Sequence, residues 1–294
     1  MAFLDHDPRV TPARADLAAR FLEGRVQADR FADGRPAQVV AASAPVRRSP
    51  SPTARLDTQV LFGETVQVYE RKDGWAWLQA DADGYVGYAP EMALSETVLP
   101  VTATVRTLRS FVFPEPDLKA PPLDALSLTA QVRVTQAHGA FSAIARGEDP
   151  VWGYMFTDHL SVPGHTAPDF VAEAERFLGV PYLWGGKDSL GLDCSGLVQT
   201  ALARTGVRAP RDSDMQEAAL GTALDCPSGR LADLMRGDLV FWKGHVGIMV
   251  DSARMLHANA THMAVTIDDL AAFAGRIAPR DGPITHIRRM PAGL

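Results

Sequence analysis

Residues 182–206, YLWGGKDSLGLDCSGLVQTALARTG, join a glycine-rich loop to an amphipathic helix and place one cysteine, Cys194, at the junction. Asp193 is a favourable N-cap, so we expect the helix to begin at Cys194 and to end at Gly206. A thiol in the first turn lies among backbone N–H groups that the helix leaves unpaired; these groups favour a thiolate and can stabilise an oxyanion. The glycines of the loop would let a substrate approach the backbone. The stretch therefore predicts a reactive cysteine.

A general base for this thiol is predicted downstream, in residues 243–260, KGHVGIMVDSARMLHANA. His245 opens an alternating strand, and Gly247 would keep the face around it open. The chain then turns and returns, which places His257 on the neighbouring antiparallel strand, facing His245 or diagonal to it. A nucleophile, a base and a polar residue that orients the base are the parts of a catalytic triad.

Two other interpretations fit the same residues. Either histidine alone could be a hydrogen-bonded core residue, and Cys194, His245 and His257 with an acid could instead bind zinc. The cysteine has no second sulfur nearby, and a helix N-terminus adds positive potential where a metal prefers negative potential. We therefore expect no metal and no cofactor, and metal analysis of the purified protein distinguishes the two interpretations.

The composition is that of an ordinary globular protein of 294 residues with a net charge of −6, which gives no electrostatic reason to bind nucleic acid or an anionic membrane. Small or peptidic partners are expected. The N-terminus has acidic residues from Asp5 onward and no signal-like apolar run, which indicates a cytoplasmic protein. Two cysteines are too few for a disulfide framework, and Cys226, in a loop with proline and glycine, is not expected to take part in catalysis.

The chain divides into an arm, two small β barrels and an α+β domain. Their expected bounds are 1–36, 37–99, 100–166 and 167–294. In the arm, TPARADLAARFL at 11–22 predicts a short helix with Leu17, Phe21 and Leu22 on one face. The barrel region has short alternating strands, and the last region has helices at 169–178 and after Cys194, followed by strands at DLVFW, HVGIMV, RMLHAN and ITHIRRM.

The two barrels are related by an offset of 66 positions, which indicates a duplication. The offset aligns apolar residues and glycines, for example Val66 with Val132, Val68 with Val134, Trp75 with Phe141, Gly87 with Gly153 and Leu94 with Leu160. A duplicated fold needs its core in both copies but a binding site in only one, so positions where the copies differ are candidates for a binding site. Glu64 falls on Ala130, Trp77 on Ala143 and Tyr85 on Val151. Trp77 is expected to be a core residue, because a barrel tryptophan is usually buried.

The motifs FLGVPYLWGGKDSLGLDCSGLVQ, PRDSDMQ, RGDLVFW, HVGIMV and LHAN, in this order over residues 176–262, resemble the NlpC family of bacterial cell-wall cysteine peptidases. The resemblance implies a papain-like fold, with Cys194 as nucleophile, His245 as base and His257 as the residue that orients the base. It also implies hydrolysis of the bond between γ-D-glutamate and meso-diaminopimelate or lysine in murein peptides.

Paired bacterial SH3-like barrels ahead of such a domain are typical of the subgroup that cuts short peptides with a free N-terminal L-alanine, as in cell-wall recycling. Asp212 is then expected to meet the amino group of the substrate, with Glu64 and Tyr85 of the first barrel near it. The resemblance places these residues in or beside the substrate groove: Tyr182, Asp193, Ser195, Asp212 and Ser213.

Two functions remain as alternatives to the peptidase. The same residues could serve an amidase or an acyltransferase with another substrate, because a fold does not fix chemistry. The chain could also bind wall fragments without catalysis, although the intact Cys194, His245 and His257 disfavour this.

Overall fold

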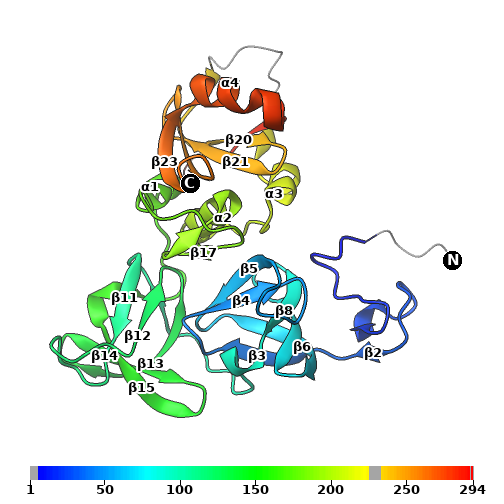
Figure 1. The fold of residues 1–294 in the computed structure, drawn as a ribbon. Helices are drawn as coiled ribbons and strands as arrows, with labels where there is room; N and C mark the ends of the chain where they lie inside the picture. Colours follow the sequence, from blue (N-terminus) through cyan, green and yellow to red (C-terminus); the bar gives the residue numbers. More distant parts are fainter. Residues whose placement is uncertain (1–5, 225–232, 292, 294) are drawn as a thin grey trace. The chain divides into compact units, whose positions relative to one another are not determined.

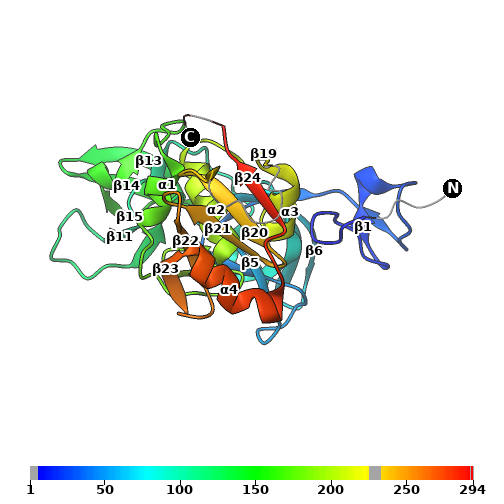
Figure 2. The ribbon, with the colours of Figure 1, turned by 90° about the horizontal axis from the view of Figure 1, so that it is seen from above.

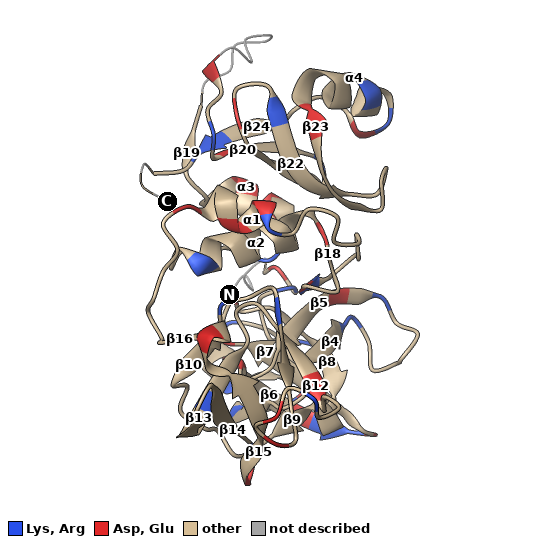
Figure 3. Ribbon diagram, turned by 90° about the vertical axis from the view of Figure 1, so that its left-hand side faces the viewer, with Lys and Arg blue, Asp and Glu red and all other residues tan. Residues whose placement is uncertain are grey.

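The computed structural model describes residues 6–224, 233–291 and 293. Two compact units divide the chain, residues 1–163 and residues 164–294 (Figure 1). Acidic and basic residues are interspersed along the elements of each unit (Figure 3). Among the described residues, every helix is too short or too polar to cross a membrane.

A seven-stranded antiparallel sheet forms the first barrel of unit one, in the order β5-β4-β8-β7-β6-β3-β9. Alternate residues of these strands, including Val39, Val66 and Leu78, point inward and form a buried core. The elements are β3 (Arg35–Val39), β4 (Ser43–Arg47), β5 (Leu56–Leu61), β6 (Thr65–Lys72), β7 (Trp75–Ala80), β8 (Val86–Pro90), the 3-10 helix η2 (Glu91–Ala93) and β9 (Leu94–Ser95).

The second half of unit one repeats this strand pattern. β13 and β14 begin and end 66 residues after β6 and β7, and the bulge of β6 between Val68 and Glu70 recurs between Val134 and Gln136. The predicted offset is therefore present in the strands themselves. The elements are β10 (Ala103–Val105), β11 (Arg109–Val112), β12 (Asp124–Ser127), β13 (Gln131–His138), β14 (Phe141–Arg146), β15 (Asp149–Phe156), η3 (Thr157–His159) and β16 (Leu160–Ser161).

The predicted α-helix at 11–22 is wrong. This segment contains only the 3-10 helix η1 (Arg20–Leu22) and the strand β1 (Ala18–Ala19), which pairs in parallel with β2 (Phe31–Ala32). A segment of this length is marginal as an isolated helix, so tertiary contacts decide its conformation.

Packing against the first barrel explains the conformation of the arm. Leu17 and Leu22 are buried in a cluster with Tyr69 and Trp77, whereas Phe21, predicted on the same face, is 61% exposed. The arm therefore packs apolar residues of helical spacing against the sheet without forming an α-helix.

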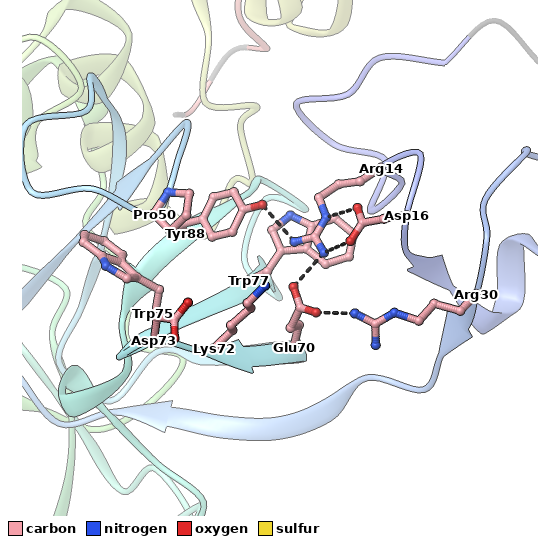
Figure 4. Close-up of a pocket in the computed structure, with 10 residues that line it drawn as sticks. All are labelled: Arg14, Asp16, Arg30, Pro50, Glu70, Lys72, Asp73, Trp75, Trp77 and Tyr88. Atoms are coloured by element: carbon pink, nitrogen blue, oxygen red, sulfur yellow. Dashed lines mark hydrogen bonds and ion pairs between the residues drawn. The ribbon is translucent and has the colours of Figure 1, made fainter.

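The side chain of Arg14 fastens the arm to the barrel (Figure 4). Its guanidinium lies 4.3 Å from the ring centroid of Trp77 and donates hydrogen bonds to Glu70 Oε2 at 2.6 Å and to the Tyr88 hydroxyl at 2.8 Å, beside a hollow of about 440 Å³. Trp77 is buried, as predicted. The second repeat has Ala143 at the position that corresponds to Trp77.

Unit two contains a six-stranded antiparallel sheet in the order β19-β24-β20-β21-β22-β23, with α1, α2 and α3 on one face and α4 on the other (Figures 1 and 2). The strands are β19 (Thr222–Ala223), β20 (Asp238–Trp242), β21 (His245–Met249), β22 (Arg254–Asn259), β23 (Ala264–Asp269) and β24 (His286–Arg289). The helices are α1 (Phe170–Glu175), α2 (Cys194–Arg204), α3 (Ser213–Ala219) and α4 (Leu270–Asp281), and the loop before α2 contains the hairpin of β17 (Lys187–Asp188) and β18 (Gly191–Leu192).

Most predicted elements of unit two are present. The helix after Cys194 and the four predicted strands lie where the sequence places them, whereas β23 and α4 were not predicted. The predicted helix at 169–178 ends early, at Glu175, and Leu178 is 49% exposed instead of lying on the apolar face.

Candidate active site

Cys194 is the first residue of α2, and Asp193 caps this helix as predicted: its Oδ1 accepts a hydrogen bond from the Gly196 N–H at 2.7 Å. The Cys194 thiol is buried, and the backbone of Val246 on β21 hydrogen-bonds to its sulfur. Because Val246 follows His245, the start of α2 lies against the end of β21 that carries this histidine. The packing thus brings the two elements together that the triad needs.

The two histidines are hydrogen-bonded to each other. His245 Nε2 lies 2.8 Å from His257 Nδ1. The register pairs Ile248 with Leu256, so His257 lies opposite Gly247 and diagonal to His245, one of the two predicted arrangements. With its Nε2 engaged by His257, His245 has Nδ1 left to face a thiol.

Gly247 has another role than the one predicted. A Cβ atom at this position would lie 2.1 Å from Met255 Sδ, so the missing side chain makes room for Met255 and does not leave the face open. The glycines of the loop are used similarly. A Cβ at Gly186 would lie 2.3 Å from the Gly191 carbonyl oxygen, and one at Gly196 would lie 2.3 Å from the Gly186 carbonyl oxygen. Gly186 and Gly196 therefore let the loop pack on itself and on α2.

Burial controls the charges of the site. It raises the pKa of the Cys194 thiol to about 12, helped by the neighbouring Asp193 carboxylate and opposed by backbone hydrogen bonds and by Arg211. Burial also lowers the pKa of His245 to about 3 and that of His257 to about 4. The prediction that the helix start favours a resting thiolate is therefore wrong: desolvation outweighs the helix terminus. The resting site holds a neutral thiol and two neutral imidazoles.

These shifts predict that the protein loses stability in mild acid. A histidine with a pKa near 6.5 when unfolded and about 3 or 4 when folded binds more protons in the unfolded state, so the free energy of unfolding falls as the pH drops below 6.5. The expected slope is on the order of 1 kcal/mol per histidine per pH unit. Urea denaturation at pH 7, 6 and 5 measures it. The variant His245→Asn/His257→Asn should show a clearly shallower slope than the wild type, and equal slopes would contradict the assignment.

A buried ion pair holds the loop and the start of α2. Arg211, 1% exposed, donates to both oxygens of Asp193, at 2.9 and 2.8 Å, and to the Ser195 hydroxyl and the Gly186 carbonyl. Asp193 Oδ2 also accepts from the Gly185 N–H at 2.8 Å. The side chains of Asp193 and Ser195, which the resemblance places at the substrate groove, are thus engaged inside the protein. Their geometry fits a role in positioning Cys194.

The other predicted substrate residues have different settings. Tyr182 is half-buried in the loop before α2; Asp212 is the N-cap residue of α3, and Ser213 begins that helix. Glu64 and Tyr85 belong to unit one, where Glu64 Oε2 accepts a hydrogen bond from the Leu61 N–H at 2.9 Å.

Three residues of the site were missed by sequence reasoning. Arg211 and Gln216 lie in the motif PRDSDMQ; Gln216 is fully buried and donates from Nε2 to the Ser195 carbonyl at 2.9 Å. Asp268 on β23 has its Oδ2 3.2 Å from His257 Nε2. A signal for Asp268 was available, since strand alternation brings residues of β23 onto the face of His257.

The described residues contain no group of three or more His, Cys, Asp and Glu side chains that could hold a metal ion. The zinc site considered as an alternative therefore has no ligand set in this part of the chain. The nitrogens of His245 and His257 that face each other are used in their mutual hydrogen bond.

A buried thiol at a helix start, packed against a strand whose histidine is hydrogen-bonded to a second histidine, defines a cysteine hydrolase. Residues 179–274 match the NlpC/P60 family, and residues 46–94 match the family described as the bacterial dipeptidyl-peptidase Sh3 domain. The chain thus carries an NlpC/P60 cysteine peptidase domain preceded by a bacterial SH3 domain, and it is a hydrolase.

Named relatives align with most of the chain. It is 29% identical over 234 residues to the gamma-D-glutamyl-L-lysine dipeptidyl-peptidase of Bacillus subtilis (strain 168), covering 72% of this chain and 75% of that protein. It is 26% identical over 252 residues to the dipeptidyl-peptidase 6 of Lysinibacillus sphaericus, covering 79% and 90%. The crystal structure of an NlpC/P60 family protein from Bacillus cereus has the same fold, with a TM-score of 0.72 and 21% identity, covering 87% of this chain and all of that one.

Proposed function

We propose that the protein hydrolyses the bond between γ-D-glutamate and the diamino acid, meso-diaminopimelate or lysine, of murein peptides with a free N-terminal L-alanine. The observation that carries this proposal is the position of Cys194 against β21, next to His245 and its hydrogen-bonded partner His257, in a chain whose relatives are named for γ-D-glutamyl-L-lysine dipeptidyl-peptidase activity. Release of a dipeptide from short fragments suits the recycling of cell-wall peptides.

In this proposal His245 removes the proton of the Cys194 thiol through Nδ1 as the sulfur attacks the γ-carbonyl carbon of D-glutamate. N–H groups at the start of α2 stabilise the oxyanion. His245 then gives the proton to the leaving amino group of the diamino acid, the C–N bond breaks, and a thioester remains on Cys194. Water, deprotonated by His245, hydrolyses the thioester and frees L-Ala-γ-D-Glu.

The burial of the site supports this order of events. With a pKa of about 12 for Cys194, almost no thiolate exists at neutral pH, so proton removal must accompany the attack. The lowered pKa of His245 keeps its imidazole neutral at physiological pH but also makes it a weak base, so the thiol proton can move to Nδ1 only as the S–C bond forms. His257 would act as the orienting residue.

We further propose that unit two is a papain-like domain, residues 167–294, and that both barrels, residues 37–99 and 100–166, are SH3-like. The shared 66-residue offset of their strands and bulges supports the second barrel's assignment. Asp212, with Glu64 and Tyr85 of the first barrel, would receive the amino group of L-alanine, and Tyr182 and Ser213 would line the groove.

Mass analysis of L-Ala-γ-D-Glu-meso-diaminopimelate, and of the lysine peptide, after incubation with the protein tests the reaction. The expected products are L-Ala-γ-D-Glu and the free diamino acid. Cleavage at another bond would favour an amidase, and transfer of the acyl group of the peptide to an added amine in place of water would favour an acyltransferase.

The free amino group is expected to be essential for binding. Acetylating the alanine should lower kcat/KM by at least about 100-fold, roughly 2.7 kcal/mol, because it removes the positive charge that the carboxylates would bind. Asp212→Asn or Glu64→Gln should weaken cleavage of the free peptide far more than that of the acetylated one. Asp214→Asn, an exposed carboxylate on the same helix, is the control. Equal cleavage of both peptides would contradict the recognition of an amino terminus.

A further inference from the structure

The two linked histidines can be protonated in two ways, and only one of them suits a base. A neutral imidazole carries a hydrogen on one of its two nitrogens. If His257 carries its hydrogen on Nε2, its Nδ1 accepts from His245 Nε2–H, and His245 Nδ1 has a free lone pair for a proton. If His257 carries it on Nδ1, His245 Nε2 must accept, His245 Nδ1 holds the hydrogen, and it cannot take a proton from the thiol.

Which tautomer His257 adopts depends on the groups around its Nε2, and two of these groups favour different tautomers. Asp268 Oδ2, 3.2 Å away, can only accept a hydrogen bond when it is ionised. Asn259 Nδ2, also 3.2 Å away, can only donate. The Asn259 orientation is fixed, because its Oδ1 accepts from the backbone N–H of His262 at 2.9 Å and its Nδ2 donates to Thr266 Oγ1 at 2.8 Å.

We propose that Asp268 is a positioning residue that sets the tautomers of both histidines, so that His245 Nδ1 is the proton acceptor. The effect of Asp268 on catalysis rests on the proposed function, whereas the positions of the ring hydrogens are a property of the protein without substrate. Asp268 prevails because its charge strengthens the bond it accepts, whereas the Asn259 amide already has Thr266 as a closer partner.

The surroundings hold the carboxylate in this role. Alternation along β23 puts Asp268 on the same side as Thr266, which is paired with His257. Arg276 on α4 donates to the same Oδ2 at 3.1 Å, and His262 Nδ1 lies 3.8 Å from it. Phe273 packs edge-on against His257 at 4.5 Å between ring centroids and limits the access of water to the pair.

Nitrogen-15 NMR of histidine-labelled protein tests the proposal directly, since protonated and unprotonated ring nitrogens differ widely in chemical shift. In the wild type, His245 should be protonated on Nε2 and His257 on Nε2. In Asp268→Ala the remaining close group is the Asn259 donor, so both rings should change to the Nδ1-protonated form. Asp268→Asn can keep an oxygen toward both His257 and Arg276 and should retain the wild-type pattern. Arg276→Gln removes the ion pair but keeps the carboxylate, and it should also retain it.

Kinetics with the tripeptide give the second readout. Asp268→Ala should lower kcat by at least about 100-fold with little change in KM, because a His245 that carries its hydrogen on Nδ1 cannot take the proton of the thiol. Asp268→Asn and Arg276→Gln should remain within about 10-fold of the wild type. Asn259→Asp in the Asp268→Ala background restores an acceptor 3.2 Å from His257 Nε2, and we expect it to recover at least about 10-fold of the lost kcat.

Unchanged histidine tautomers in a folded Asp268→Ala protein would overturn the proposal. Equal loss of kcat in Asp268→Ala and Arg276→Gln would do the same, because it would assign the effect to the ion pair with α4. The NMR measurement needs no substrate. If the wild type fails to cleave the tripeptide while the tautomers change as expected, the proposed function fails and the role of Asp268 stands.

Discussion

Cys194→Ala should lower hydrolysis of the tripeptide by at least about 10⁴-fold and leave a folded protein, because every covalent step of the proposed reaction passes through this sulfur. The alanine fills most of the buried space of the thiol, so stability should change by only about 1 kcal/mol. Product release measured by mass spectrometry, with circular dichroism to monitor folding, checks both parts. A full rate in a pure sample of the variant would exclude the proposed nucleophile.

Matched variants separate the roles at this site. His245→Ala should cost nearly as much as Cys194→Ala, whereas His257→Asn or His257→Gln should retain part of the activity, because orienting a base needs only a hydrogen-bond partner. Cys226→Ser is the control thiol variant and should be active; Cys226 lies outside the described residues. Iodoacetate should modify one site, and with the pKa of Cys194 raised by burial the reaction should accelerate as the pH rises above neutrality.

Local patterns were sufficient to predict the elements that carry the triad. The α2 start follows from Asp193 and the apolar spacing after Cys194, and β21 and β22 follow from alternation on either side of a turn. The proximity of His245 and His257 then follows from antiparallel pairing alone. These features depend on neighbours within about twenty residues, which a sequence displays directly.

Features that depend on distant partners were not predictable in this way. The arm has helical spacing but packs on Tyr69 and Trp77, more than forty residues away, without forming an α-helix. Asp268 lies only 11 residues from His257 and was missed for another reason: β23 was not predicted, so its alternation was not used to place the carboxylate beside His257. The pKa of Cys194 was predicted in the wrong direction because the helix start is visible in the sequence, whereas the depth of burial is not. The sequence also did not show that Asp193 accepts hydrogen bonds from the Ser195 hydroxyl and from Arg211.

Arg211 holds the loop and the start of α2 around the nucleophile through its hydrogen bonds to Asp193, Ser195 and Gly186. Arg211→Met should lower the free energy of unfolding by about 3 to 5 kcal/mol, because it leaves the Asp193 carboxylate buried without its partner. The folded fraction should also lose at least about 100-fold in kcat/KM, because Asp193 connects the Gly185 N–H to the first turn of α2, and a shift of about 1 Å at the sulfur costs that much. Urea denaturation measures the free energy of unfolding, and steady-state kinetics normalised to the concentration of folded protein measures kcat/KM.

Arg204 offers a matched control within the same helix. Its guanidinium is also nearly buried, 8% exposed, and pairs with Glu173 at 3.3 Å, but it lies at the far end of α2 from Cys194. Arg204→Met should therefore destabilise the protein while leaving kcat/KM of the folded fraction within about 3-fold of the wild type. In Asp193→Asn/Arg211→Met the unpaired charge is removed and the N-cap oxygen is kept, so stability should recover by about 1 to 3 kcal/mol relative to Arg211→Met, without full activity. If Arg211→Met and Arg204→Met lose the same activity, the Arg211–Asp193 ion pair only stabilises the fold. If only Arg211→Met loses activity, this ion pair determines where the thiol lies.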